Sequence, residues 1–267
     1  MSKPLAGVRV LDLTHILSGP FATMTLADLG AEVVKVEPPE GERTRSLLAR
    51  DPKHSIAGMG AYFLCLSRNK KSVVIDLKTA AGRELFYELV AHADIVCDNF
   101  SVGVTAKLGI DHDRLAAINP RIITCSVTGF GETGPGRNRT AFDQVVQAYG
   151  GNMSITGNDA EHPLRSGLPI ADLGGSLFGL VGILTALYER ERSGRGQHLD
   201  ISMLDGQIAM MSYMATMYFL SGEDPEPIGN SHFVHVPYNS FRTRDGFIVI
   251  AVIFDEFWQS LLEVLGA

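Results

Sequence analysis

The stretch 167–188, GLPIADLGGSLFGLVGILTALY, places a single carboxylate, Asp172, two residues before a Gly-Gly pair and a strongly apolar run. Asp is a favoured helix N-cap, because its side-chain oxygen accepts a backbone N–H of the first turn. A carboxylate at an exposed helix start, where bulk has been removed, is also a candidate nucleophile. Taken alone, the stretch favours the cap.

A second candidate group lies near the N-terminus, in DLTHILSGP (12–20). This junction offers His15 and Gly19 but lacks the G-x-G-x-x-G pattern of a dinucleotide-binding turn, so NAD binding is not predicted. His15 has three possible roles: a base, a donor to a ligand, or a structural side chain bonded to local backbone. Its spacing alone favours the structural role.

Two further segments have the chemistry to bind phosphate. SRNKKS (67–72) gathers three cations around Asn69, either as a solvated basic turn or as a phosphate-binding patch. GFGETGPGRNR (129–139) is a glycine-rich loop whose backbone N–H groups could hold a phosphate, although it matches no Walker pattern. No metalloprotease motif or nucleophile elbow is present.

The composition of the 267-residue chain narrows the function classes. A formal net charge of −7 argues against a nucleic-acid binder that works by neutralising phosphates. The three cysteines, Cys65, Cys97 and Cys125, lack the spacing of a zinc site or disulfide framework, which predicts buried thiols in a reducing compartment. The N-terminus enters a strand without a signal-like region, and the apolar run 177–187 is too short for a membrane span. We therefore expect a cytoplasmic protein.

Strand and helix patterns alternate in the first half of the chain. Strand-like runs are followed by helical spacing, as at 20–30 and 79–93, which predicts a doubly wound α/β fold with a mostly parallel sheet and helices on both faces. Such sheets bind ligands beyond the carboxyl ends of their strands. The predicted strands are 8–14, 31–37, 71–77, 94–100 and 121–130.

The second half changes character. Helices are predicted at 142–151 and 174–194, and a short strand followed by one Met-rich helix at 196–220. A linker at 221–232 precedes a hairpin at 240–252 and a final helix. We expect a large domain at 1–220 and, at 221–267, a linker with the start of a smaller α+β domain whose remainder lies outside this sequence.

Together these segments carry a resemblance. The segments that carry it are VRVLDLTHILSGPFATMTLADLGAEVVKVEPPEG, ADIVCDNFSVG, NPRIITCSVTGFGETGP, FDQVVQAYGGNMSITG and LPIADLGGSLFGLVGILTALYERERSGRGQHLDISMLDG. They closely resemble the family III CoA-transferases of the formyl-CoA transferase and L-carnitine CoA-transferase type. The resemblance covers essentially the whole chain. It implies a Rossmann-like large domain that binds CoA, and family members continue beyond the end of this sequence.

The resemblance also implies a mechanism. The family nucleophile is an aspartate at the position of Asp172, which attacks an acyl-CoA to form an aspartyl–acyl anhydride and then an aspartyl-CoA thioester. The helix N-terminus is expected to help keep this carboxylate ionised, by about 0.3–1 kcal/mol. Backbone N–H groups near Gly174 and Gly175 are candidates to stabilise the oxyanion.

The CoA-binding positions carried over from the family are His15, Leu66, Asn69, Lys70, Lys71, Asn99, Phe100 and Lys107. Gln144 is a candidate polar contact near the nucleophile, although an exposed helical glutamine is the simpler interpretation. One departure stands out, because Pro38 occupies the place of a nucleotide-binding arginine. Arg43 or Arg45 would then compensate, or the adenine end is held differently.

The resemblance implies a CoA-transferase acting on an acyl-CoA, with succinyl-CoA as a candidate, and a small carboxylic or dicarboxylic acid. An acyl-CoA racemase is the first alternative, but this chain has Phe142 where those relatives carry a proton-transferring histidine. A non-catalytic CoA-binding protein is the second. The expected assembly is an interlocked homodimer with no tightly bound cofactor, metal, nucleic acid or membrane.

Overall fold

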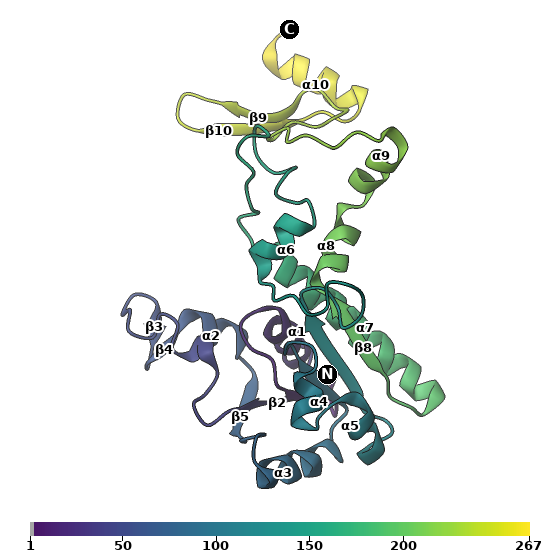
Figure 1. Ribbon diagram of the computed structural model, residues 1–267. Helices are drawn as coiled ribbons and strands as arrows, with labels where there is room; N and C mark the ends of the chain where they lie inside the picture. The colour runs from purple at the N-terminus through teal and green to yellow at the C-terminus, as the bar shows by residue number, and fades with distance from the viewer. Residues whose placement is uncertain (1–2) are drawn as a thin grey trace. The chain divides into compact units, whose positions relative to one another are not determined.

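The computed structural model describes residues 3–267, and its largest element is a six-stranded parallel sheet (Figure 1). All neighbouring strands in it are parallel, as predicted, in the order β5-β2-β1-β6-β7-β8. From β1 the chain builds outward in both directions, so the carboxyl ends of β1 and β6 flank a switch point of the kind where α/β sheets bind ligands. The strands are β1 (Arg9–Asp12), β2 (Glu32–Glu37), β5 (Lys70–Val74), β6 (Ile95–Asp98), β7 (Ile123–Thr128) and β8 (His198–Ser202).

Helices cover both faces of this sheet, which confirms the predicted α/β fold. Because side chains alternate along a strand, Val10 of β1 joins one hydrophobic core and Leu11 joins the other. The first core contains residues of α1 (Ser18–Asp28) and α7 (Ile170–Ser193), which run close together in Figure 1. The second core contains residues of α3 (Ala80–Val90) and α5 (His112–Ile118).

Helix α7 begins at Ile170, four residues before the predicted start. The Gly-Gly pair therefore lies inside the helix and serves close packing. A Cβ added to Gly174 would lie 2.5 Å from the Cε of Met210, and one added to Gly175 would lie 2.9 Å from the Cγ of Met203. These glycines let α7 approach the helix that follows β8, so their small size is explained without a substrate.

The length of α7 also corrects the expectation of a short apolar run. Its 24 residues are long and apolar enough to cross a bilayer by length and composition alone. Leu180 and Ile183 of this helix are buried in the first core. A single helix of this kind is weak evidence for a membrane span.

The segment between β2 and β5 contains elements that the sequence did not predict. They are a 3₁₀ turn η1 (Arg43–Arg45), a small hairpin of β3 (Ser55–Ile56) and β4 (Met59–Gly60), and α2 (Ala61–Leu66). Cys65 lies on α2 and is exposed, so the prediction that all three thiols are buried was wrong for this one. Cys97 and Cys125 are buried side by side on β6 and β7.

The Met-rich segment forms two helices rather than the single predicted one. The break is at Ser212, whose positive φ of 51° is incompatible with a continuous right-handed helix. The other elements are α4 (Val104–Leu108), α6 (Asp143–Tyr149), α8 (Met203–Met211), α9 (Tyr213–Ser221), the antiparallel hairpin of β9 (Tyr238–Arg242) and β10 (Phe247–Ala251), and α10 (Asp255–Leu265).

The chain forms two compact units. The first contains the residues up to Gln147 together with Leu168–Met210, and the second contains Ala148–Gly167 and Met211–Ala267. The second unit thus includes a segment from within the first predicted domain, and the 220/221 boundary stays a prediction. The candidate site described below belongs entirely to the first unit.

Candidate active site

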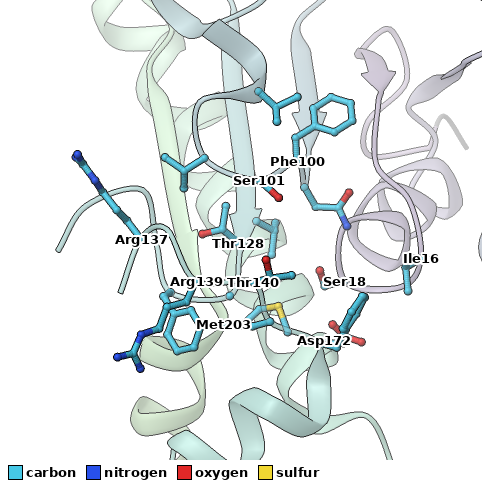
Figure 2. A pocket seen from close by; sticks show the side chains of 18 of the residues that line it. Ile16, Ser18, Phe100, Ser101, Thr128, Arg137, Arg139, Thr140, Asp172 and Met203 are labelled. Atoms are coloured by element: carbon cyan, nitrogen blue, oxygen red, sulfur yellow. The ribbon is translucent and has the colours of Figure 1, made fainter. Parts of the chain in front are cut away.

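A cavity of about 360 Å³ lies beyond the carboxyl ends of β1, β6 and β7 and includes Asp172; we call it the Asp172 pocket (Figure 2). Figure 2 shows Asp172 on the side of the pocket formed by Ser18 and Ile16, and Arg137 and Arg139 on the opposite, loop side. The pocket is lined by residues 15–18, 99–102, 127–130 and 137–142, together with Val104, Asp172 and Met203.

Asp172 lies in the first turn of α7, but it does not cap that helix. The N-cap is Pro169, and its side chain makes no capping bond. Instead, the backbone N–H groups of Ala171 and Asp172 donate to Oδ1 of Asp143, at 2.9 and 3.2 Å. Asp143 is held in turn by the Nε2 of buried Gln147, at 2.6 Å. The cap of α7 is therefore supplied by Asp143, 27 residues before the helix begins, which leaves the Asp172 carboxylate available to the pocket.

The electrostatics of Asp172 are the reverse of the sequence expectation. Burial, and then the negative charge of Asp143, raise the pKa of the Asp172 carboxyl from 3.8 to about 7. Gly174 and Gly175 also lie past the first turn, where backbone N–H groups bond to carbonyls inside the helix. They are not free to stabilise an oxyanion, so that expectation is corrected as well.

Three predicted ligand-binding residues share the pocket with Asp172. Asn99 and His15 exchange two hydrogen bonds: the His15 N–H donates to Oδ1 of Asn99 at 2.9 Å, and Nδ2 of Asn99 donates to the His15 carbonyl at 2.7 Å. The imidazole of His15 lies 5.4 Å from the ring of Phe100, and burial lowers its pKa. This arrangement joins the strand ends of β1 and β6 beside the candidate nucleophile.

The cations of the basic turn are occupied by carboxylates. The Nζ of Lys70 is buried and lies 2.8 Å from Oδ2 of Asp12. Lys71 pairs with Glu32, and Asn69 donates to Asp28. None of these three residues lines the Asp172 pocket. Their assignment to CoA stays a prediction, and for Lys70 it would require the buried ion pair to open.

The remaining predicted residues also lie outside the pocket. Leu66 is a buried side chain of α2, and Lys107 is exposed on α4. Gln144 is exposed on α6, one turn away from Gln147, which makes the contact to Asp143. Within residues 3–267, no three His, Cys, Asp or Glu side chains are arranged to hold a metal ion.

Comparison with known proteins places this geometry in a family. The model for CoA-transferase family III matches residues 5–267. This chain belongs to CoA-transferase family III. Its relatives include the acetyl-CoA:oxalate CoA-transferase of Acetobacter aceti, 40% identical over 99% of this chain and 67% of that protein. The succinyl-CoA:glutarate CoA-transferase of Mus musculus is 40% identical over 93% of this chain and 56% of its own length.

Solved structures agree with the family membership. A CAIB/BAIF family protein from Brucella suis matches with a TM-score of 0.91 at 40% identity, over all of this chain and 70% of that one. The M. tuberculosis protein Rv3272 matches with a TM-score of 0.84 at 33% identity, over 99% of this chain and 69% of that one. Among the curated relatives, this family III chain spans between about half and two thirds of each full length.

Beside the Asp172 pocket, this family III chain has a second cavity of about 340 Å³, which we call the Pro38 pocket. Arg45 does not line it, because Nε and Nη2 of Arg45 both bind the carboxylate of Glu37 at 2.6 Å. Arg43 does line it, together with Lys78, and these two are the candidates to replace the arginine missing at Pro38. The Pro38 pocket is lined by residues 13–15, 36–38, 40–43 and 75–78, with Phe100 and Leu108.

Several residues that the sequence reasoning missed lie around Asp172. Asp143 caps its helix, and Gln147 holds Asp143. Tyr62 of α2 lies within the electrostatic reach of Asp172, since burial and then the Asp172 charge raise the pKa of its hydroxyl. The spacing of Asp143 and Gln147, four residues apart on one helix face, could have predicted the contact between them. It could not have predicted that Asp143 also binds the start of α7.

Proposed function

We propose that this protein is a CoA-transferase in which Asp172 is the nucleophile. The observation that carries the proposal is the position of the Asp172 carboxylate, which is half-buried in a pocket at the carboxyl edge of the sheet and has a pKa raised to about 7. A carboxylate of ordinary pKa is a weak nucleophile. One with a pKa near 7 is more basic and is still about half ionised at neutral pH, which suits attack on a thioester.

The reaction proceeds by acyl exchange with no external water. An Asp172 oxygen attacks the thioester carbonyl, the C–S bond breaks, and an aspartyl–acyl anhydride and CoA thiolate form. The thiolate attacks the aspartyl carbonyl, releasing the donor acid and leaving an aspartyl-CoA thioester. The acceptor carboxylate then displaces the thiolate to form a second anhydride. The thiolate finally takes the acceptor acyl group, which regenerates Asp172.

The names of the relatives and the lining of the pocket favour a dicarboxylic acid as acceptor. The relatives are named for transfer to oxalate, glutarate and mesaconate, which are all dicarboxylates, with acetyl-CoA or succinyl-CoA as donors. Arg137 and Arg139 belong to the loop that lines the Asp172 pocket; their guanidinium groups point away from Asp172 in Figure 2, and we propose that Arg137 turns inward to bind the second carboxylate of the acceptor. We propose succinyl-CoA as donor and a small dicarboxylate as acceptor.

Trapping of the covalent intermediate tests this function. The full-length protein is incubated with succinyl-CoA, treated with hydroxylamine and digested, and the peptide containing Asp172 is analysed by mass spectrometry. The expected result is a hydroxamate at Asp172 that requires succinyl-CoA. Transfer without any Asp172 adduct would refute the covalent mechanism.

Two other outcomes identify the alternatives. Exchange of the acyl α-proton without transfer to acids would indicate a racemase, and the position of Phe142 in the pocket argues against that result. CoA binding without either reaction would indicate a non-catalytic protein. A panel of dicarboxylates then identifies the acceptor.

We further propose a cytoplasmic homodimer with a Rossmann-like large domain and no tightly bound cofactor. The net charge of −7 is consistent with a protein that binds neither nucleic acid nor an anionic membrane surface. Light scattering of the full-length protein, with lipid-vesicle and nucleic-acid controls, tests the assembly and both absences.

A further inference from the structure

The turn that separates the Asp172 pocket from the Pro38 pocket has an unusual backbone. Ile16, at its centre, has a φ of 67°, in the left-handed region. For a β-branched residue this conformation is a genuine outlier and is unfavourable, so the surroundings must hold it. His15, beside it, lines both pockets. The strained residue thus lies where the two cavities meet.

Side chains from other strand ends hold this turn through its backbone. Asn99 bonds both the N–H and the carbonyl of His15, as described above. Nζ of buried Lys35 donates to the Thr14 carbonyl at 2.6 Å. The Ile16 N–H itself donates to Oε1 of Glu42, at 3.1 Å. Glu42 therefore makes the contact that acts directly on the strained residue.

Glu42 is fixed for this role. Its other oxygen, Oε2, accepts from the Thr44 N–H at 3.0 Å and from the Thr44 hydroxyl. Its own N–H donates to Oε2 of Glu37 at 2.9 Å, and Glu37 is held by the bidentate bond from Arg45. Glu42 and Thr44 are both buried. A rigid chain of hydrogen bonds therefore runs from β2 to Ile16.

The backbone of Ile16 determines the shape of one wall of the Asp172 pocket. Ile16 is followed by Leu17 and then by Ser18, the first residue of α1, and all three line the Asp172 pocket. If Ile16 relaxed to a right-handed or extended backbone, the carbonyl of His15 and the start of α1 would change direction. The wall of the Asp172 pocket beside the carboxylate would then no longer have its present shape.

We propose that Glu42 is a positioning residue for the transfer reaction: it holds Ile16 in the left-handed conformation and so shapes the pocket wall beside Asp172. This inference rests on the proposed function, since the effect is measured on transfer. Glu42 acts in this role through the backbone of Ile16; because it also lines the Pro38 pocket, KM for succinyl-CoA is measured beside kcat. The effect of removing Glu42 should therefore be large when the residue at position 16 has a Cβ, which makes the left-handed conformation unfavourable, and small when that residue is glycine.

A double-mutant experiment on the full-length protein tests that dependence. Glycine adopts a φ near +67° at little cost, whereas alanine retains the Cβ that makes it unfavourable. Ile16→Gly and Ile16→Ala remove nearly the same side chain, so they form a matched pair. Glu42→Ala is introduced into the wild type and into each of these backgrounds, and kcat, KM for succinyl-CoA and Tm are measured.

In the wild type and in Ile16→Ala, we expect Glu42→Ala to lower kcat by about ten- to a hundredfold, which corresponds to the strain that Glu42 offsets. KM should change less than kcat. In Ile16→Gly, the same substitution should lower kcat by no more than about threefold. Equal losses of kcat in the glycine and alanine backgrounds would overturn the proposal, as would an unchanged kcat in Glu42→Ala.

Two controls keep the result interpretable. Should Glu42→Ala fail to fold in the wild type, recovery of soluble protein by Ile16→Gly and not by Ile16→Ala supports the proposal, and recovery by both or by neither overturns it. Hydroxylamine labelling of Asp172 separates this inference from the proposed function. If the wild type forms no adduct, the proposal that Asp172 is the nucleophile is contradicted. If the adduct forms in the wild type and to the same extent in Glu42→Ala, only the positioning role of Glu42 is contradicted.

Discussion

Asp12 and Asp172 are two carboxylates of the same unit that lie near one edge of the sheet, yet their electrostatics are opposite. Burial raises the pKa of both. At Asp12, the ammonium groups of Lys70 and Lys35 and hydrogen bonds from Lys70 and Thr14 outweigh burial and hold the pKa at about 2. At Asp172, the neighbouring charge is another carboxylate, Asp143, and the pKa rises to about 7.

One fold thus holds a carboxylate paired with cations, Asp12, and one without such a partner, Asp172, for which we propose a reactive role. Burial alone does not make a carboxylate reactive, because a buried cation converts it into an ion pair that stabilises the sheet. At Asp172 no cation lowers the pKa and Asp143 supplies a second negative charge, which suits the nucleophilic role proposed for it. Strongly raised carboxyl pKa values in a cleft are typical of functional sites.

The largest effect that tests this comparison is expected from Asp172→Asn. Asparagine keeps the shape of the side chain but removes the nucleophilic oxygen, so we expect transfer to fall by about a thousandfold or more. The measurement is the rate of CoA transfer from succinyl-CoA to a dicarboxylate, followed by chromatography. CoA binding and Tm should be retained. A rate near that of the wild type would show that Asp172 is not the reactive member of the pair.

Much of this fold was predictable from the sequence, because parallel strands and their helices are local patterns. The parallel sheet and the helices on both faces follow from alternation, and general rules of α/β sheets predict a ligand site at the carboxyl edge, where the Asp172 pocket lies; the strand order was not predicted. Asp172 was found through the family resemblance and not through its local sequence, which favoured a helix cap.

The partners of the charges were not predictable, since they depend on long-range contacts. Lys70 looked like a free cation in a basic turn, but its carboxylate partner is 58 residues away, at Asp12. Asp143 caps a helix that begins 27 residues later, so no local pattern connects the two. The sequence shows which residues carry charge, whereas the fold decides which charges are compensated.

The next largest effect is expected when the structural pair is broken. Lys70→Met removes the ammonium group that is hydrogen-bonded to the fully buried Asp12 and leaves only the more remote charge of Lys35, and we expect a loss of about 3–5 kcal/mol in the free energy of unfolding. Urea denaturation followed by circular dichroism measures it. Adding Asp12→Asn should recover most of the loss. Lys71→Met, which removes an exposed partner of Glu32, is the matched control and should change stability little.

The contributions of Asp12 and Asp172 to the free energy of unfolding should change with pH in opposite directions. The folded state raises the pKa of Asp172, so ionisation of this group costs stability as the pH rises from about 4 to about 7. The advantage of Asp172→Asn over wild type in unfolding free energy should therefore grow across this window and then level off. Asp12 has a lowered pKa, so its contribution is present above pH 4 and is lost as the pH falls towards 2. A constant difference between Asp172→Asn and wild type from pH 4 to pH 8 would contradict the raised pKa.

The smallest effect, and the finest test of the comparison, is expected from Asp143→Asn. The new amide oxygen can still accept the N–H groups of Ala171 and Asp172, while the negative charge beside the nucleophile is gone. Because that charge is the second cause of the raised pKa, the rise of kcat/KM with pH should move to lower pH, and maximal transfer should fall as Asp172 becomes less basic. Asp143→Ala removes both the charge and the cap, so it should show the same displacement with an added loss of about 1 kcal/mol in stability. If both variants lose stability but keep the wild-type pH profile, Asp143 is a cap alone, and burial by itself sets the difference between Asp172 and Asp12.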